Sequence, residues 1–203
     1  HVIAADLSNA AAAAEAVRSW AKKNGRKPAG ITTFICEAML ETARLAQELE
    51  LAFHSETLVQ RTRDKHHASM AWRRESVPTP ATARIRDLND LLDFTARTDA
   101  PWILKPIDGS GSAWVLHIRD DQDLPKAHAH LCAELDKSAY LAQQYITGRE
   151  FSADLYITGG KTHLLRLTEK YLLPVQGRAG LVGAYYPARI NAHTRERICD
   201  TCH

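Results

Sequence analysis

The order in which helix and strand patterns follow one another limits the fold of this chain more than any other feature. Residues 1–6 are a short run of strand-forming residues, and residues 7–25 are a helix pattern that ends at Gly25. Residues 28–35 predict a second strand, and residues 36–51 a helix with apolar side chains three and four positions apart. This order is typical of a parallel sheet with crossover helices. We therefore expect the first sixty or so residues to form the end of an α/β lobe.

A domain boundary is expected near Pro78. Residues 55–76 predict a helical connection, and Pro78 and Pro80 interrupt it, because proline removes a backbone donor and clashes with the preceding turn. The chain thus divides into residues 1–77, with the α/β lobe and the connecting helix, and residues 78–203.

The second part has a different pattern. A helix is expected over residues 83–98, and its buried side should carry Leu88, Leu91, Leu92 and Phe94. The later expected elements are, in order, a strand–loop–strand hairpin over 101–118, a helix over 124–138, and strands over 139–146, 149–160 and 161–173. Consecutive strands joined by glycines predict an antiparallel sheet with helices, so the fold class is α/β followed by α+β.

Composition narrows the class of protein. Hydrophobic residues make up 45% of the 203, enough for a core, and 26 basic against 24 acidic residues do not call for a polyanionic partner such as nucleic acid. There is no apolar run of about 18 residues, no secretory signal in the first ten residues, and the four cysteines are too scattered for a disulfide scaffold. We expect a soluble, cytoplasmic protein without a membrane or nucleic-acid partner, of unknown oligomeric state. Both ends look cut, so we also expect a longer parent protein.

A loop rich in small residues follows the expected strand at residues 101–107. It consists of Asp108, Gly109, Ser110, Gly111 and Ser112, whose backbone N–H groups can form an anion-binding nest. In a P-loop the lysine follows the glycines and a helix begins there, whereas here Lys105 precedes them and a strand follows. The loop alone therefore fits a flexible hairpin turn equally well.

Several other residues could complete a nucleotide site. Lys105 is flanked by apolar residues, so it should be partly buried and need an anion, which a bound ligand could supply. The alternatives are a salt bridge to a carboxylate of the protein, or a side chain that points to solvent. Lys65 is another candidate cation, or else a solvated helix residue. The segment Gln143, Gln144, Tyr145 and Ile146 could offer backbone groups to a base, and Glu150 could bind a ribose; the alternative is an ordinary hairpin with an exposed charge.

Together these pieces resemble a known family. The stretches RDKHHASMAWRRESVPTP (63–80), PWILKPIDGSGSAWVL (101–116), AQQYITGREFSADL (142–155) and LTEKYLLP…GAYYPAR (167–189) occur in the order found in the ATP-grasp superfamily. They look most like its carboxylate–amine ligase branch, which includes L-amino-acid ligases. The resemblance runs from about Ile3 to Arg189, and residues 31–51 resemble the end of the lobe that precedes the ATP-grasp domain.

The resemblance implies a role for each candidate. Lys65 and Lys105 would contact ATP phosphates, and residues 108–112 would close over the β- and γ-phosphates as a lid. Residues 143–146 would be the hinge that binds adenine, and Glu150 would bind the ribose. Lys170 would face the phosphates or the carboxylate substrate. The resemblance also marks Tyr186, Pro187 and Ala188 as a substrate-side segment without an assigned chemical role.

The implied reaction uses ATP to convert a carboxylate, expected to be that of an amino acid, into an acyl phosphate that an amine attacks. The family holds Mg²⁺ with acidic residues expected beyond His203, so we assign no metal ligand in this chain and expect ATP binding without turnover. Two alternatives share the nucleotide machinery: a biotin-dependent carboxylase or carbamoyl-phosphate-type enzyme, and a non-catalytic nucleotide-binding module.

The last five residues, CDTCH, match the pattern for haem attachment and could begin a zinc site. We interpret the match as a coincidence within a helix over 194–203. His128 and His130 are two positions apart on a predicted helix and face different ways, so we do not expect them to share a metal.

Overall fold

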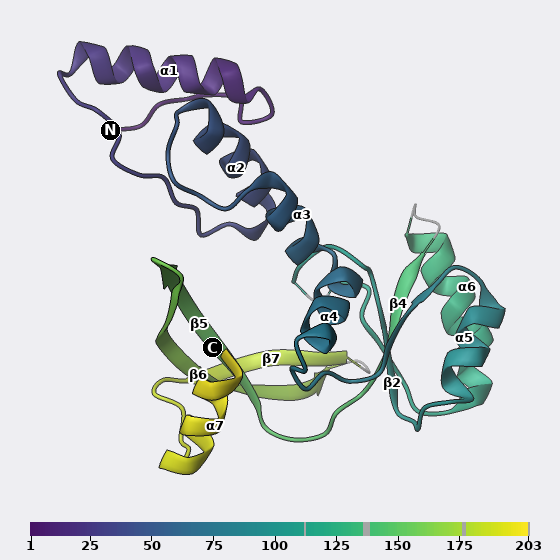
Figure 1. The fold of residues 1–203 in the computed structure, drawn as a ribbon. Helices are drawn as coiled ribbons and strands as arrows, with labels where there is room; N and C mark the ends of the chain where they lie inside the picture. Colours follow the sequence, from purple (N-terminus) through teal and green to yellow (C-terminus); the bar gives the residue numbers. More distant parts are fainter. Residues whose placement is uncertain (112, 136–138, 176–177, 203) are drawn as a thin grey trace. The chain divides into compact units, whose positions relative to one another are not determined.

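The structure is a computed structural model that describes residues 1–111, 113–135, 139–175 and 178–202. The chain divides into two compact units. We call the first, His1–Ala71 with Ile107–Ala113, the helical unit, and the second, Trp72–Pro106 with Trp114–His203, the sheet unit. Each unit is described by itself (Figure 1).

The helical unit consists of helices joined by irregular segments. These helices are α1 (Ala10–Lys23), the 3₁₀ turn η1 (Cys36–Ala38), α2 (Met39–Glu48), α3 (Glu56–Arg63) and the first part of α4 (Lys65–Arg74). Asn9 caps α1, because its side chain accepts a hydrogen bond from the N–H of Ala12, and Gly25 just past the helix has a φ of 61°.

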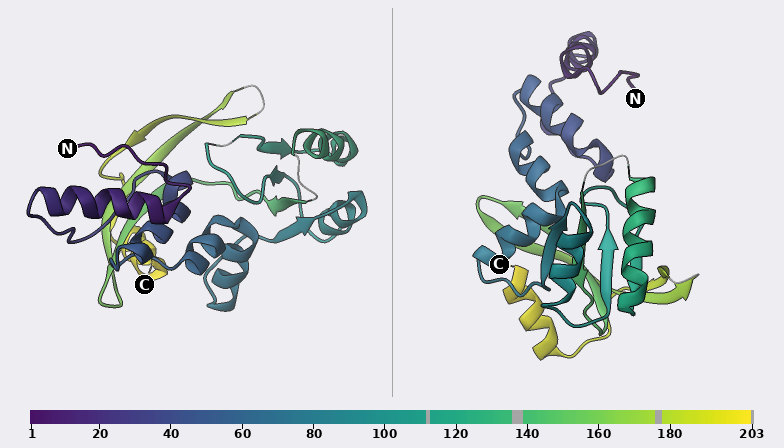
Figure 2. Two further views of the ribbon diagram at one scale, coloured as in Figure 1. Left: turned by 90° about the horizontal axis from the view of Figure 1, so that it is seen from above. Right: turned by 90° about the vertical axis from the view of Figure 1, so that its right-hand side faces the viewer.

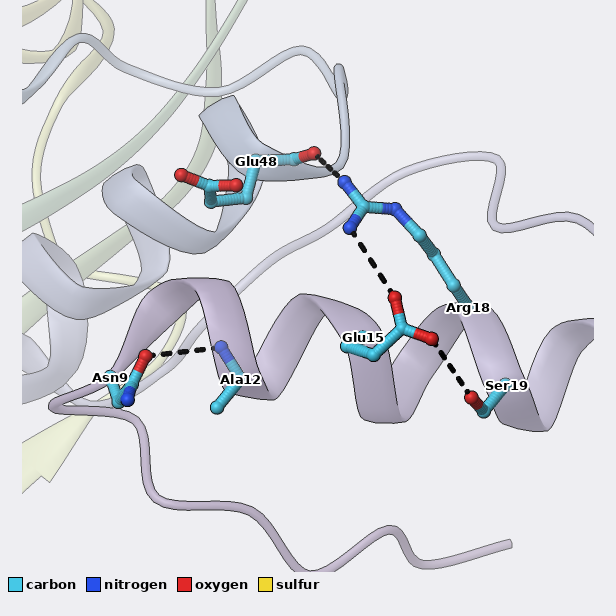
Figure 3. A network of polar contacts seen from close by, with 6 residues as sticks. All are labelled: Asn9, Ala12, Glu15, Arg18, Ser19 and Glu48. Carbon is cyan, nitrogen blue, oxygen red and sulfur yellow. Dashed lines mark hydrogen bonds and ion pairs between the residues drawn. The ribbon is translucent and has the colours of Figure 1, made fainter.

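Small side chains allow α1 and α2 to pack closely. The buried residues are small: Ala13, Ala14 and Ala21 on α1, and Thr42, Ala43 and Ala46 on α2. Figure 3 shows the polar edge of this pair: Arg18 of α1 forms an ion pair with Glu15 and donates a hydrogen bond to the backbone carbonyl of Glu48. Of the consecutive alanines 10–14 at the start of α1, Ala13 and Ala14 thus lie in this packed face, whereas Ala11 and Ala12 are exposed.

The two strands expected in this part of the chain are not formed. Residues 1–6 and 28–35 have no regular secondary structure, and the side chains of Val2, Phe34 and Ile35 are exposed. A strand needs a neighbour to satisfy its backbone N–H and C=O groups, and none of the described residues before Thr82 forms one. The expectation of strands over residues 1–6 and 28–35 was therefore wrong.

The sheet unit contains a four-stranded antiparallel sheet in the order β1-β4-β2-β3. Its strands are β1 (Thr82–Ile85), β2 (Trp102–Lys105), β3 (Leu116–Ile118) and β4 (Tyr140–Gln144). The expected hairpin of β2 and β3 is confirmed, with Trp102 opposite Ile118. Two helices pack against this sheet, α5 (Leu88–Thr95) and α6 (Leu124–Glu134) (Figure 2). The 3₁₀ turn η2 (Asp121–Asp123) precedes α6.

One core joins these helices to the sheet. Its large side chains are Ile85, Leu91, Phe94, Trp102, Leu104, Ile118, Leu124, Leu131 and Tyr140. Two expectations about residues 83–98 were wrong. Residues up to Ile85 belong to strand β1, because the side chain of Asp87 caps α5 and the helix begins only after it. Leu92 is 43% exposed, whereas Leu91 and Phe94 are buried.

The sheet unit also contains a three-stranded antiparallel sheet, β5-β6-β7. Strands β5 (Glu150–Thr158) and β6 (Lys161–Val175) are joined by Gly159 and Gly160, both at positive φ, as expected. Strand β7 (Arg178–Tyr185) was not expected, and α7 (Ala192–Cys202) follows it. The predicted combination of helices with antiparallel sheets is confirmed. None of the described helices is long and apolar enough to cross a membrane.

Candidate nucleotide-binding site

Lys105 ends the central strand β2, next to the strand that carries the expected hinge. Its Nζ donates a hydrogen bond to Oε1 of Gln143 on β4 over 2.7 Å, and Nε2 of Gln143 donates to Oγ1 of Thr82 on β1 over 3.0 Å. Three neighbouring strands thus fix the lysine by a chain of side-chain hydrogen bonds. The Gln143 amide oxygen accepts this hydrogen bond and so fixes the position of the Lys105 ammonium at the end of β2.

The expected hinge, residues 143–146, is held by its own backbone. The N–H of Gln144 donates to the carbonyl of Ala81 and the N–H of Tyr145 to the carbonyl of Pro101, both over 2.9 Å. These two amides are therefore occupied by the sheet. In the part of the chain that the structure describes, the N–H of Ile146 has no hydrogen bond, and its side chain is 62% exposed. Ile146 is thus the hinge residue whose backbone could donate to a base.

Tyr145 and His117 form an aromatic pair beside the hinge. Their rings meet edge to face with centroids 5.0 Å apart. Burial, and secondarily the positive charge of Arg119, lower the pKa of His117, so this imidazole is neutral near pH 7. The pair makes the β3 side of the hinge apolar and uncharged.

The glycine loop belongs to the helical unit, together with Lys65. Gly109 and Gly111 have φ of 94° and 68°, which side chains with a Cβ rarely adopt, so glycine is required for this loop path. Nζ of Lys65 donates to the carbonyl of Gly109 over 3.0 Å, and the Lys65 N–H donates to the carbonyl of Ile107 over 2.9 Å. The structure therefore brings this lysine and the loop together. Ser112, also expected in the lid, lies outside the described residues.

A half-open pocket of about 310 Å³ lies in the helical unit beside the loop. Its lining includes Glu37, Glu41, Asp64 and Asp108, with Arg63 as the basic residue. Glu37 accepts a hydrogen bond from Oγ of the loop residue Ser110, and this bond, with a smaller contribution from Arg63, lowers the pKa of Glu37. Oε2 of Glu41 is buried and has no hydrogen-bond partner among the described atoms.

Glu150 and Lys170, expected to contact the ribose and the phosphates or substrate, contact each other. They are opposite one another on β5 and β6, and Nζ of Lys170 lies 2.7 Å from Oε1 of Glu150. Both side chains are partly exposed, so an ion pair of this kind contributes little to stability and can exchange partners with a ligand.

A second polar cluster on the same sheet was missed by the reasoning from sequence. Glu169 is only 6% exposed; it accepts hydrogen bonds from Nε of Arg149 over 2.8 Å and from the N–H of Arg189 over 3.3 Å. Arg149 also donates to the carbonyl of Arg189, and the Arg189 guanidinium lies over the ring of Tyr185. The hydrogen bond from Arg149 is the main reason that the pKa of Glu169 is lowered.

This cluster holds the segment that follows β7. The N–H of Ala188 also donates to the carbonyl of Leu167, so the residues around Tyr186–Ala188 are tied to β6. The adjacent residues Glu169 and Lys170 point to opposite faces of the strand, which separates a buried structural carboxylate from the Glu150–Lys170 pair. This alternation of side chains along a strand was the sequence signal from which the different environments of Glu169 and Lys170 could have been predicted. Among the described residues, no group of three or more His, Cys, Asp or Glu side chains could hold a metal ion.

Comparison with known proteins identifies the family. Residues 62–203, which include β1–β7 and both candidate lysines, match the ATP-grasp domain. The chain belongs to the ATP-grasp family. No curated protein matches the chain in sequence.

Solved structures agree with this assignment. An L-amino acid ligase from Bacillus licheniformis is 22% identical with a TM-score of 0.68, over 95% of this chain and 44% of that one. A phosphoribosylglycinamide synthetase from Anaerococcus prevotii is 16% identical with a TM-score of 0.67, over 96% and 47%. A biotin carboxylase domain of the 2-oxoglutarate carboxylase from Hydrogenobacter thermophilus, solved with MgADP and bicarbonate, is 17% identical with a TM-score of 0.67, over 93% and 44%. The chain thus spans less than half the length of these ATP-grasp structures, and the likeness shows a shared fold.

Proposed function

We propose that this chain is the ATP-binding part of an ATP-grasp ligase that joins a carboxylate, that of an amino acid, to an amine. The observation that carries the proposal is the position of Lys105. Its ammonium donates a hydrogen bond to the side chain of Gln143 on β4, three residues before Ile146, whose backbone N–H has no hydrogen bond among the described residues. A positioned cation beside a backbone donor on an apolar strand end suits a nucleotide, with the cation for phosphate and the amide for the base.

The other candidates have corresponding roles in the proposal. Lys65 and the loop around Gly109 contact the phosphates, with loop N–H groups as additional donors. Glu150 accepts hydrogen bonds from the ribose hydroxyls once it leaves Lys170, and Lys170 then becomes available to an anionic group of the ligand.

The proposed chemistry explains why such cations are needed. A carboxylate is a poor electrophile, so its oxygen attacks the γ-phosphorus of ATP; the bond to ADP breaks and an acyl phosphate forms. The amine then attacks the acyl carbon, and phosphate leaves. Lysines and backbone N–H groups align and neutralise the phosphoryl charge during transfer, and closure of the loop excludes the water that would hydrolyse the intermediate.

Magnesium would supply positive charge to offset the negative charge of the phosphates in such a reaction. The described residues do not supply a matching set of donors: Glu150, Asp154 and Glu169 are each engaged by a basic side chain. We therefore derive no step through the metal for this chain.

The proposal is tested first by ATP binding, measured by isothermal titration calorimetry on the chain. Replacing Lys105 by alanine removes a hydrogen bond to a charged ligand, which is worth about 1.5–3 kcal/mol, so ATP should bind roughly 10- to 100-fold more weakly. Lys126→Ala, an exposed lysine on α6 of the same unit, is the matched control and should leave the affinity unchanged. Equal affinity of the Lys105→Ala variant and the wild type would disprove the assignment of the site.

The reaction is tested on the full-length protein by release of ADP. Release that requires both an amino acid and an amine supports the ligase. Release that requires bicarbonate supports the carboxylase or carbamoyl-phosphate-type alternative, a chemistry for which the Hydrogenobacter thermophilus enzyme with bound bicarbonate is a structural precedent. Saturable ATP binding without ADP release under any of these conditions supports a non-catalytic nucleotide-binding module.

A further inference from the structure

A cysteine, a histidine and a tyrosine form a connected group on the side of the sheet unit where α6 lies (Figure 1). Cys132 and His128 are one turn apart on α6, and Sγ of Cys132 lies 3.6 Å from Nε2 of His128. Nδ1 of the same imidazole lies 2.9 Å from the hydroxyl oxygen of Tyr140, the first residue of β4. The nucleotide-binding hypothesis uses none of these three side chains.

The arrangement is that of a nucleophile, a base and a group that orients the base. Nε2 is close enough to take the thiol proton, and the resulting imidazolium can donate its Nδ1–H to the Tyr140 oxygen. Tyr140 is 2% exposed and lies in the main core, so its position is rigid. Its burial, with smaller contributions from the charges of Cys132 and Asp90, raises the pKa of the phenol, which therefore stays neutral and can accept that hydrogen bond.

Cys132 differs from the other three cysteines in combining exposure with this base. Cys36 is also exposed, but no histidine is among the described residues that line the pocket beside it. Cys199 and Cys202 are only partly exposed on α7, and burial raises the pKa of the Cys202 thiol. Cys36 is thus an internal reference of similar exposure.

We propose that Cys132 is the reactive thiol of this protein and a site of covalent modification by small disulfides such as oxidised glutathione. The thiol proton passes to Nε2 of His128, and Sγ attacks one sulfur of the disulfide. A new S–S bond joins Cys132 to that half of the reagent, the original S–S bond breaks, and the other half leaves as a thiolate that the imidazolium can protonate. Electrons balance within the exchange, and no further oxidant is needed.

The test follows each cysteine separately by mass spectrometry of peptides after timed exposure of the native protein to iodoacetamide at pH 7. Because the imidazole of His128 can accept the thiol proton as Sγ attacks, Cys132 should react about three- to tenfold faster than Cys36. Incubation with oxidised glutathione should add one glutathione at Cys132 before any other site. Equal rates at Cys132 and Cys36, or glutathione at another cysteine first, would overturn the proposal.

Two variants test whether His128 acts as a base toward Cys132, or whether exposure alone explains the reactivity of this thiol. His128→Gln keeps a polar side chain of similar reach and should lower the Cys132 rate to that of Cys36, whose own rate should not change. Tyr140→Phe keeps the buried ring and removes the hydroxyl, so it should slow Cys132 to an intermediate rate. An unchanged Cys132 rate in folded His128→Gln protein would refute the role of the imidazole, and the unchanged Cys36 rate, with circular dichroism, reports that the variant is folded.

Discussion

The two sheets of the sheet unit bury their side chains to very different extents. In the four-stranded sheet, Ile85, Leu104 and Ala142 are fully buried, and Tyr140 is 2% exposed. In the three-stranded sheet, the buried side chains among those described are Leu167 and Glu169. Large apolar side chains of that sheet are more than 40% exposed, namely Leu155, Tyr156, Ile157, Leu165, Tyr171, Leu181 and Val182.

The two sheets therefore differ in their side-chain contacts, with apolar burial in the first and mostly solvent-accessible, individually weak ion pairs in the second. The four-stranded sheet has a core with α5 and α6, and each fully buried Leu or Ile contributes about 1.5–3 kcal/mol by leaving water. The three-stranded sheet has instead a series of ion pairs across its strands, Arg149–Glu169, Lys170–Glu150 and Arg166–Asp154. Its stability should therefore depend on pH and salt in a way that the first sheet does not share.

The largest expected effect is the loss of a core side chain from the first sheet. Leu104→Ala on β2 leaves a cavity where the side chain is 0% exposed, so unfolding should become easier by about 2–5 kcal/mol. The matched variant Leu165→Ala on β6, where the side chain is 63% exposed, should change stability by about 0.5 kcal/mol or less. Urea denaturation, with hydrogen exchange to report each sheet, measures both. Equal losses would contradict the comparison.

The sequence predicted strands β2, β3 and β4 of the first sheet and β5 and β6 of the second, but neither β1 nor β7. Alternating and continuous apolar runs at 101–107 and 139–146 identified β2 and β4, because each of these strands has a buried partner that requires such a pattern. The runs at 1–6 and 28–35 also contain apolar residues but have no neighbouring strand, and pairing is a property of the whole fold, not of a short segment. Strand β7 was missed because its sequence, RAGLVGAY, has small residues and glycines where a strand pattern needs large ones.

The candidate site was predicted residue by residue, but its contacts were not. Residue type and order were enough to select Lys105, the glycine loop and the hinge. They could not show that Gln143 is the side-chain acceptor for Lys105, since residues 38 positions apart meet only through the β2–β4 register. Nor could they show that Glu150 and Lys170 pair, or that Glu169 is buried beside them.

The second largest effect is expected at the Lys105–Gln143 contact of the first sheet. Gln143→Met keeps the length of the side chain and removes both of its hydrogen bonds, to Nζ of Lys105 and to Oγ1 of Thr82. Leaving a half-buried ammonium without this acceptor should lower stability by about 1–3 kcal/mol. Urea denaturation at pH 7 measures the loss, with Gln144→Met on the same strand as control. A variant as stable as the wild type would mean that water replaces the amide at no cost.

A smaller effect with a distinctive pH dependence is expected at Glu169 in the second sheet. Its pKa is lowered below the ordinary 4.5, chiefly by the hydrogen bond from Arg149, so the folded state favours the carboxylate. The stabilisation is present above pH 4.5 and is lost as the pH falls through the lowered pKa. Glu169→Gln should therefore be less stable than the wild type at pH 7, and the gap should narrow as the pH falls below 4.5 and through the lowered pKa of Glu169. A difference in stability between the wild type and Glu169→Gln that does not change with pH would show that Glu169 stabilises the sheet by packing and not by its charge.

The smallest effect is expected at the Asp154–Arg166 pair, whose atoms lie 2.5 Å apart but whose side chains are 42% and 59% exposed. Exposed ion pairs contribute little to the free energy of unfolding. A double-mutant cycle with Asp154→Asn and Arg166→Gln should therefore give a coupling energy of about 0.2–1 kcal/mol. In 1 M NaCl the Debye length falls to about 3 Å, and the coupling should approach zero. A coupling above about 2 kcal/mol, or one that salt does not change, would mean that the pair is shielded from water. The three-stranded sheet would then be covered in solution, and its exposed apolar side chains would belong to an interface.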